Sequence, residues 1–298
     1  MLQGSILGPL LFIIYVNDIS ASVNGEITQF ADDTSVVIYN KLKDDMTKNI
    51  NTNMNELTHW FKNNNLTLNT NKTKFIFFTT KHMENDINIH PSVDSTKFLG
   101  LFIDSNLKWE SHVDNLSKKL TGINYMLYSL RTYVDRNVLL TAYFGIFQSK
   151  MAYGIPFWGG YDSKLKRIFT LQKRAIRTIF FLGPCDSCRL FFKSERILTA
   201  PGVYVLQIAE LVKNGTIKTA PRLHEYETRG KSLVQTSSFK LKLFENNIDN
   251  RGPKIFNNLP SEIKTISNPK KFKIKLKKWL LHHTFYSLEE FFGHTEQG

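Results

Sequence analysis

Residues 27–39 read ITQFADDTSVVIY and place two adjacent aspartates, Asp32 and Asp33, between two runs rich in strand-forming residues. β-branched and aromatic residues favour strands and Asp favours turns, so the stretch predicts a hairpin with strands at 27–30 and 35–39. Two carboxylates at its tip would offer the oxygen ligands that Mg²⁺ prefers. A solvated turn without a metal would have the same sequence, because an Asp side chain also hydrogen-bonds to nearby backbone amides.

The surrounding residues predict a mixed α and β unit. A helix is expected from Pro9 to Ser20, because Pro is tolerated in the first helical turn. Apolar residues at three- and four-residue steps predict an amphipathic helix over residues 43–63. Further strands are expected at residues 66–68, 74–79 and 98–103. The first 105 residues therefore read as an α+β half-domain.

Beyond Asp104 the pattern becomes helical. Residues 109–131 place Val113, Leu116, Leu120, Ile123 and Leu127 on one stripe. Similar stripes predict helices at 137–150, 163–182 and 269–283. Residues 214–260 contain many turn formers and predict no ordered set of elements.

The charge distribution favours a polyanionic partner. The net charge is +13, although residues 1–50 hold three lysines against six acidic residues and so carry −3. A hydrophobic content of 42% excludes general disorder, and two cysteines exclude a disulfide scaffold. The pair Cys185 and Cys188 has the spacing of half a zinc site, which His224 or the pair His282 and His283 would have to complete from far away.

The apolar run from Ile6 to Val16 has an alternative interpretation as a secretory signal. No Lys or Arg precedes it and Gly8-Pro9 interrupts it, whereas a signal peptide has a basic start and an unbroken core. The run is also shorter than the roughly 20 residues of a membrane span. We therefore expect a soluble intracellular chain.

Four groups of residues in order resemble the palm of reverse transcriptases, most closely the non-LTR, LINE-type enzymes of jockey-like retrotransposons. They are Gln3-Gly4-Ser5 with Gly8-Pro9-Leu10-Leu11-Phe12, then Phe30-Ala31-Asp32-Asp33, then Leu66-Thr67-Leu68-Asn69 with Lys72-Thr73, and Phe98-Leu99-Gly100. Residues 254–264, 271–281 and 285–292 are similar to the C-terminal tail of such proteins.

The resemblance implies roles for these residues. Asp32 and Asp33 would be the catalytic, metal-binding carboxylates, with Phe30 and Ala31 beside the substrate and Mg²⁺ or Mn²⁺ as the cofactor. Gln3, Gly4 and Ser5 match the loop near the incoming nucleotide and template. Lys72 matches a palm lysine beside the departing pyrophosphate, although a surface lysine is an equal reading. Phe98, Leu99 and Gly100 would be the primer grip, or simply a buried strand with a glycine bulge.

A basic helix follows the palm-like unit. Residues 164–177 contain no acid and six bases, which are Lys164, Lys166, Arg167, Lys173, Arg174 and Arg177. On a helix, Lys166, Lys173 and Arg177 would lie opposite Ile168, Leu171, Ala175 and Ile179. This pattern favours a thumb helix that binds a phosphate backbone, and an ordinary solvated helix face is the alternative. The lysines at 270–278 fit either reading equally.

The resemblance also sets the expected architecture and function. The fold class is α+β, with an incomplete polymerase palm at 1–105, a helical thumb-like region at 106–200, and a C-terminal region at 201–298 with a basic tail helix. The full enzyme would be an RNA-directed DNA polymerase that uses an RNA template, a DNA primer and deoxynucleotides, in the nucleus and without membrane or small-molecule cofactor.

A third palm carboxylate precedes the Gln-Gly-Ser loop in this family, and only Met1 and Leu2 stand there. We therefore expect a C-terminal fragment that is inactive alone. Asp18 would not substitute, because it lies at the end of the predicted helix that begins at Pro9. The alternatives are a non-catalytic, basic nucleic-acid-binding protein and an inert translated relic.

Overall fold

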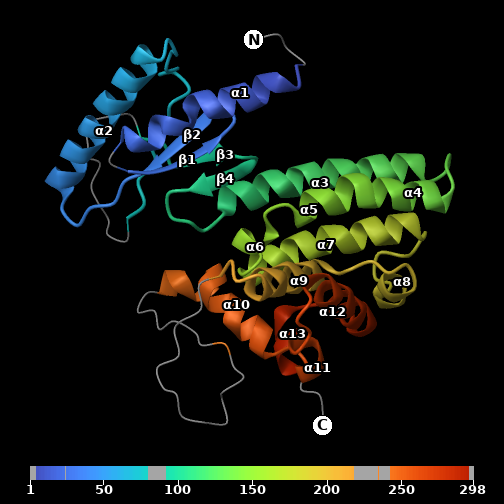
Figure 1. Cartoon of the computed structure of the whole chain (residues 1–298). Helices are drawn as coiled ribbons and strands as arrows, with labels where there is room; N and C mark the ends of the chain where they lie inside the picture. The colour runs from blue at the N-terminus through green and yellow to red at the C-terminus, as the bar shows by residue number, and fades with distance from the viewer. Residues whose placement is uncertain (1–4, 24, 80–91, 218–233, 235–241, 295–298) are drawn as a thin grey trace, which may run out of the picture. The chain divides into compact units, whose positions relative to one another are not determined.

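The computed structural model describes residues 5–23, 25–79, 92–217, 234 and 242–294. The chain divides into two units, Met1–Thr96 and Lys97–Gly298. Figure 1 labels the elements of each unit along the chain. The two units are described separately below.

The described residues of the first unit include a hairpin and two longer helices. Helix α1 (Leu7–Val16) continues into a 3₁₀ turn at Asn17–Ala21, and the antiparallel hairpin of β1 (Glu26–Phe30) and β2 (Asp33–Val37) follows. Helix α2 (Lys43–Asn63) has the predicted bounds. Met46 begins its regular hydrogen bonding by donating its N–H to Leu42 O at 3.1 Å. The hairpin at residues 27–39 and the two helices were therefore predicted correctly.

The core of the first unit is small. Five buried apolar side chains form it, from α1, the 3₁₀ turn, the loop after that turn and α2: Val16, Ile19, Val23, Leu57 and Trp60. Most of α1 lies outside this core, since Leu10, Leu11, Ile13 and Ile14 are each more than half exposed. Helix α1 is thus apolar on all sides while burying only its C-terminal end.

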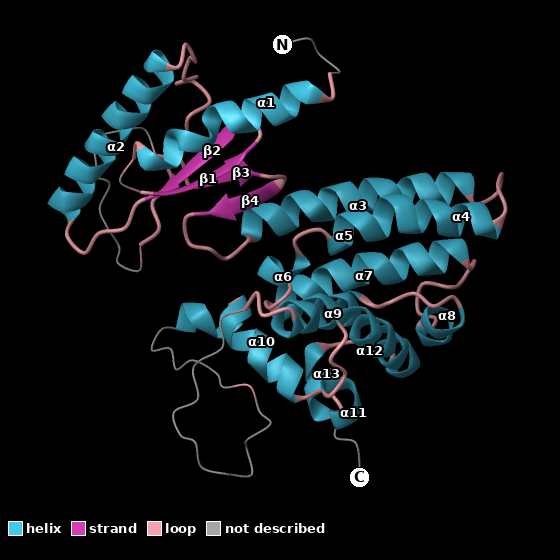
Figure 2. Cartoon of the chain, in the orientation of Figure 1, coloured by secondary structure: helices cyan, strands magenta, loops and turns pink. Residues whose placement is uncertain are grey.

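The second unit is helical apart from one short hairpin. Strand β3 (Ser95–Phe98), in which the two units divide, pairs with β4 (Leu101–Asp104). The helices that follow are α3 (Glu110–Leu130), α4 (Arg136–Ala142), a π-helical segment (Tyr143–Gln148), α5 (Ser149–Ala152), α6 (Ile155–Trp158), α7 (Asp162–Ile179), α8 (Arg189–Ser194), α9 (Ala200–Lys213), a 3₁₀ turn (Lys242–Asn246), α10 (Ile248–Asn257), α11 (Ser261–Lys264), α12 (Pro269–His283) and α13 (Leu288–Gly293). Within the described residues, Figure 2 shows strands only in the two hairpins.

One core holds the whole second unit together. It runs from Val113 on α3 to Phe291 on α13 and includes the predicted stripe of α3. Helix α9 packs against α7, α10 and α12. Gln172 on α7 is completely buried and hydrogen-bonds to the chain just before and at the start of α9, at Leu198 O and Ala200 N. Elements from the middle and the end of the sequence therefore depend on each other.

Three predicted strands differ from the structure. Residues 66–68 form no strand, and residues 74–79 contribute only a parallel bridge between Phe75 and Ser92. The stretch 98–103 is a hairpin instead of one strand, because Leu99 and Gly100 have φ of 44° and 85°. Two consecutive positive φ values make a type I′ turn, which reverses the chain.

The observed fold is mostly helical with two small sheets, compatible with an α+β protein. The predicted palm, thumb and C-terminal boundaries at 105 and 200 stay a prediction. The contacts of the chain divide it at residue 96, and a single core spans residues 113–291.

Candidate functional site

The aspartate hairpin, residues 26–37, presents its carboxylates at a tight turn. Phe30 pairs with Asp33, so Ala31 and Asp32 are the two central residues of the turn. Ala31 has φ of 52°, the one positive φ in this turn. This is the pattern of a type II′ turn, whose first position normally holds Gly. An Ala there costs about 1 kcal/mol, the kind of strain that concentrates at functional sites.

Both carboxylates of the aspartate hairpin are accessible. Asp32 and Asp33 are exposed, as are Ala31 and Phe30, which is 62% exposed. Asp32 belongs to the turn, whereas Asp33 is already the first residue of β2, a refinement of the prediction that both lie in the turn. Mg²⁺ is usually bound through one or two carboxylates and completed by water and phosphate oxygens, so the donor chemistry fits this ion. Among the described residues, no group of three or more metal-ligating side chains gathers.

Among the described residues, no hydrogen bond or ion pair joins the other residues assigned by resemblance in the first unit to this turn. Gln3 and Gly4 lie outside the described residues, and Ser5 is exposed. Lys72 is exposed in a turn, where its N–H is 3.2 Å from Asn69 Oδ1. No hydrogen bond or ion pair between described atoms links Lys72 to the aspartates. Asp18 is exposed in the 3₁₀ turn after α1.

The predicted primer grip is the turn of the β3–β4 hairpin. The hydroxyl of Tyr153 donates to Leu99 O, and a Cβ on Gly100 would lie 3.2 Å from the ring of Tyr153. The neighbouring Gly154 has φ of 65° and would clash with Leu101 if it carried a Cβ. Glycines at 100 and 154 thus permit a close approach of the hairpin to α5, as Gly does generally.

The N-terminal half of the basic helix α7 is neutralised by α3. Arg167 lies 2.5 Å from Asp114, and Lys164 Nζ lies 4.0 Å from Glu110. Both acids are on α3, which packs along α7. Since these pairs are partly exposed, each adds little stability, but it lowers the net positive charge there.

The C-terminal half of α7 is different. Lys173 lies 5.0 Å from the ring of Phe169 and is half-buried. Arg177 donates to the backbone oxygen of Asp186 at 3.0 and 3.1 Å, which leaves its charge uncompensated by that bond. Lys166 and Arg174 are exposed, and no ion pair to them occurs in the described part of the chain. The predicted apolar stripe is buried at Ile168, Ala175 and Ile179 and half-buried at Leu171.

The end of α3 contributes two further residues to this surface: Tyr128, a tyrosine whose ring could stack a base, and Arg131, which was not predicted. Tyr128 and Arg131 lie beside Arg174 and Arg177 around one groove. The sequence signal was the absence of any Asp or Glu from residues 115–134, next to the acid-free stretch of α7.

The two cysteines differ in burial, and the described residues bring no third metal ligand to them. Cys185 is exposed, whereas Cys188 is buried with its Sγ 3.6 Å from Lys173 O. Burial raises the pKa of the Cys188 thiol, against the lowering effect of Arg177 and Lys173. His224 lies outside the described residues.

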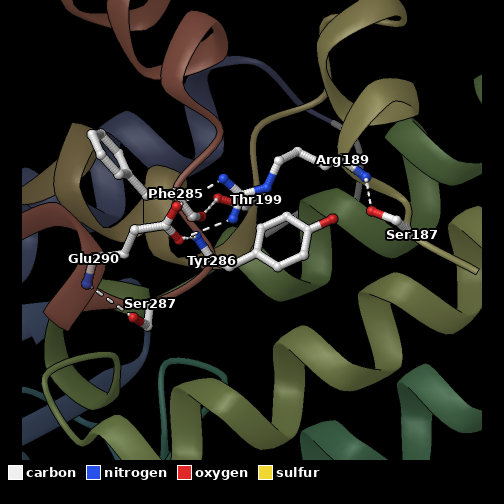
Figure 3. Close-up of polar contacts among 7 residues, drawn as sticks. All are labelled: Ser187, Arg189, Thr199, Phe285, Tyr286, Ser287 and Glu290. Atoms are coloured by element: carbon white, nitrogen blue, oxygen red, sulfur yellow. Dashed lines mark hydrogen bonds and ion pairs between the residues drawn. The ribbon is translucent and has the colours of Figure 1, made fainter. Parts of the chain in front are cut away.

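Figure 3 shows how the C-terminal residues are fixed beside α8. Arg189 makes a two-pronged ion pair with Glu290, at 2.8 and 3.2 Å. Glu290 also accepts from Tyr286 N, and Ser287 Oγ caps α13 by accepting from Glu290 N. Charge-assisted bidentate pairs fix geometry as well as energy, so this network is an anchor for α13.

Comparisons with known proteins find a family match for about the first third of the chain. Residues 1–103 match the family model described as reverse transcriptase (RNA-dependent DNA polymerase). Residues 1–103 are therefore similar to this family, and we call them the reverse transcriptase region.

Three proteins of Drosophila melanogaster are similar over a longer stretch than the reverse transcriptase region. The probable RNA-directed DNA polymerase from transposon X-element is 29% identical over 192 residues, 59% of this chain and 21% of that protein. The RNA-directed DNA polymerase from mobile element jockey is 23% identical over 197 residues, 59% and 21% of the two chains. The corresponding protein from transposon BS is 25% identical over 201 residues, 59% and 22%.

These findings confirm the resemblance to jockey-like reverse transcriptases. The chain spans about a fifth of the length of these relatives. No solved structure matches the chain. In the part of the chain that the structure describes, no helix is both long and apolar enough to cross a membrane.

Proposed function

We propose that this chain is part of an RNA-directed DNA polymerase of a jockey-like mobile element, with Asp32 and Asp33 as its metal-binding carboxylates. The observation that carries the proposal is the strained, exposed turn at Ala31-Asp32 inside the matched reverse transcriptase region. Its substrates would be an RNA template, a DNA primer and deoxynucleotides. Action on chromosomal DNA would place it in the nucleus.

The two aspartates would hold Mg²⁺ or Mn²⁺, which supplies charge stabilisation during phosphoryl transfer when it is bound. The chain's own contribution is positional. The paired strands β1 and β2 fix the backbone of Asp33, and the two-residue turn fixes that of Asp32. Exposure leaves both carboxylates accessible to a phosphate-bound cation.

Metal titration tests the assignment of the carboxylates. The chain is titrated with Mn²⁺ and binding is followed by electron paramagnetic resonance. The matched control is Asp44 and Asp45, another adjacent exposed pair in the same unit, at the start of α2. We expect the double variant Asp32→Asn, Asp33→Asn to lose the tightest Mn²⁺ site and Asp44→Asn, Asp45→Asn to keep it. Equal loss in both variants would refute the assignment.

The polypeptide of residues 1–298, assayed alone, would not extend a primer, because the resemblance places a third carboxylate before residue 3. A shortfall of several kcal/mol in transition-state stabilisation lowers the rate by orders of magnitude. The assay is primer extension on an RNA template with Mg²⁺ and deoxynucleotides. Product that disappears in the Asp32→Asn, Asp33→Asn variant would refute this inactivity while supporting the role of the aspartates.

A second candidate function is nucleic-acid binding without catalysis. The observation that favours it is the basic C-terminal half of α7, with Arg174 exposed and no acid on α7 after Asp162. Salt-dependent binding of nucleic acid by the Asp32→Asn, Asp33→Asn variant, at the affinity of the parent, would separate binding from chemistry.

A further inference from the structure

A groove of about 400 Å³ lies between the C-terminal parts of α3 and α7. Its lining combines guanidinium, phenol and hydroxyl groups, from Arg131, Arg174, Arg177, Tyr128, Thr170 and Thr178. We call it the arginine groove. Leu182 and Pro184, from the turn after α7, close one side of it.

The arginine groove keeps a net positive charge. At the other end of the same two helices, Glu110 and Asp114 pair with bases of α7, whereas none of the lining residues is acidic. Two helix C termini add about −0.5 charge each, so three guanidiniums leave about +2. Asp186, whose backbone oxygen accepts from Arg177, accepts from Gly183 N at 2.7 Å with its carboxylate and does not line the groove.

Arg131 is held in place by two rings. Its guanidinium carbon lies 4.1 Å from the centroid of Tyr128 and 5.3 Å from that of Phe181. A guanidinium stacked on aromatic faces keeps its N–H edge available for a phosphate. The groove therefore contains a cation whose orientation is set before any ligand arrives.

The turn after α7 holds Phe181 in an unusual backbone conformation near Arg131. Leu182 N donates to Arg177 O at 2.9 Å, the bond that closes a Schellman motif at the end of α7. Phe181 occupies the left-handed position of that motif, with φ of 54°, where helices normally use Gly. A left-handed Phe costs about 1 kcal/mol, and its ring is 59% exposed yet near Arg131.

We propose that the arginine groove binds one nucleotide unit of single-stranded nucleic acid. The phosphate would contact Arg174 and Arg131, and the base would stack on the ring of Tyr128, which is 54% exposed. Stacking on an aromatic side chain requires a base that is already unstacked, which favours a single strand over a duplex. The inference rests on the proposed function for the identity of the polyanion.

The experiment measures fluorescence anisotropy of a labelled oligodeoxythymidine bound to the full chain in EDTA. Tyr128→Ala is expected to weaken binding about tenfold, the effect of one lost stacking contact. The matched control is Tyr125→Ala, since Tyr125 is 74% exposed on the same helix and does not line the groove. We expect less than a twofold effect from it.

Two further variants separate stacking from charge and from folding. Tyr128→Phe keeps the ring and should bind like the parent. Arg174→Ala should weaken binding more than Lys271→Ala, which removes an exposed charge from α12. Equal effects of Tyr128→Ala and Tyr125→Ala would overturn the proposal, as would equal weakening of a blunt duplex by Tyr128→Ala.

Failure of this inference is distinguishable from failure of the proposed function. EDTA removes the metal site from the binding assay, so loss of Mn²⁺ binding at Asp32 and Asp33 leaves its result unchanged. Conversely, unchanged binding in Tyr128→Ala overturns the groove and leaves the metal titration intact. Circular dichroism melts of each variant, which should match the parent because Tyr128 is half exposed, identify any loss of fold.

Discussion

The substitution Gln172→Met is expected to lower the free energy of unfolding of the second unit by about 4 kcal/mol. The side chain of Gln172 is completely buried and makes three hydrogen bonds. Its amide nitrogen donates to Tyr143 Oη and to Leu198 O, both at 2.8 Å, and its amide oxygen accepts from Ala200 N at 2.7 Å. Met keeps the length of the side chain and removes all three bonds.

The magnitude follows from what the substitution leaves behind. A buried backbone N–H and a buried C=O without partners each cost about 1–3 kcal/mol. The fully buried hydroxyl of Tyr143 loses the N–H that Gln172 donates to it, which adds about 1 kcal/mol to the loss of stability. Burial raises the pKa of Tyr143, so its hydroxyl stays neutral and does not add the penalty of a buried charge.

Urea unfolding followed by tryptophan fluorescence measures this loss. The chain has four tryptophans, and Trp60 is the one in the first unit. A Trp60→Phe background therefore restricts the signal to the second unit. The control is Tyr143→Phe, which is expected to lower the free energy of unfolding by about 1 kcal/mol. The double variant Tyr143→Phe, Gln172→Met should lose less stability than the sum of the two single variants, because the two side chains share one hydrogen bond.

Two results would refute this reasoning. A loss below about 1 kcal/mol in Gln172→Met would mean that water or rearrangement satisfies the orphaned groups. Strict additivity in the double variant would mean that Tyr143 and Gln172 do not interact.

Three other outcomes are expected. Gly160→Ala should destabilise the second unit by about 1–3 kcal/mol, because the added Cβ would lie 2.5 Å from a backbone oxygen. Gly122→Ala should stabilise it by about 0.5–1 kcal/mol, because Gly122 lies in a helix with open space around it. Thermal melts of both variants test the contrast, and equal shifts in melting temperature would contradict it. At pH 8, iodoacetamide should modify Cys185 and spare Cys188, since burial raises the pKa of the Cys188 thiol; peptide mass spectrometry would show equal labelling of both if the reasoning fails. Burial lowers the pKa of His112 from 6.5, so its contribution to stability is complete above pH 6.5 and is lost as the pH falls below it; an identical acid dependence of unfolding in His112→Gln would contradict this sign.

Regular periodicity made some elements predictable to the residue. The helices predicted at 43–63 and 269–283 have those bounds, because each has one apolar stripe between polar faces. Helix α9 was missed because almost every side chain in Ala200–Lys213 is apolar and buried, so no stripe marks its period. The prediction of one strand at 98–103 was wrong at Leu99, because a leucine side chain gives no indication of a positive φ.

The sequence predicted the residue types of the candidate sites but not the ion pairs that those residues form. The pair Asp32 and Asp33 marks a turn through the local preferences of Asp. The spacing of the basic residues on α7 predicts which of them share a helix face. The acids that neutralise Lys164 and Arg167 lie on another helix, at Glu110 and Asp114. Such pairing depends on tertiary packing, which no local pattern in α7 encodes.

The shared core has a genetic consequence. Leu276 on α12 and Phe291 on α13 are completely buried in the same core as Leu120 and Ile168, on α3 and α7. A frameshift or early stop codon within the codons for residues 269–293 would therefore uncover the core beneath helices encoded far upstream. The integrity of the arginine groove thus depends on codons that specify none of its lining.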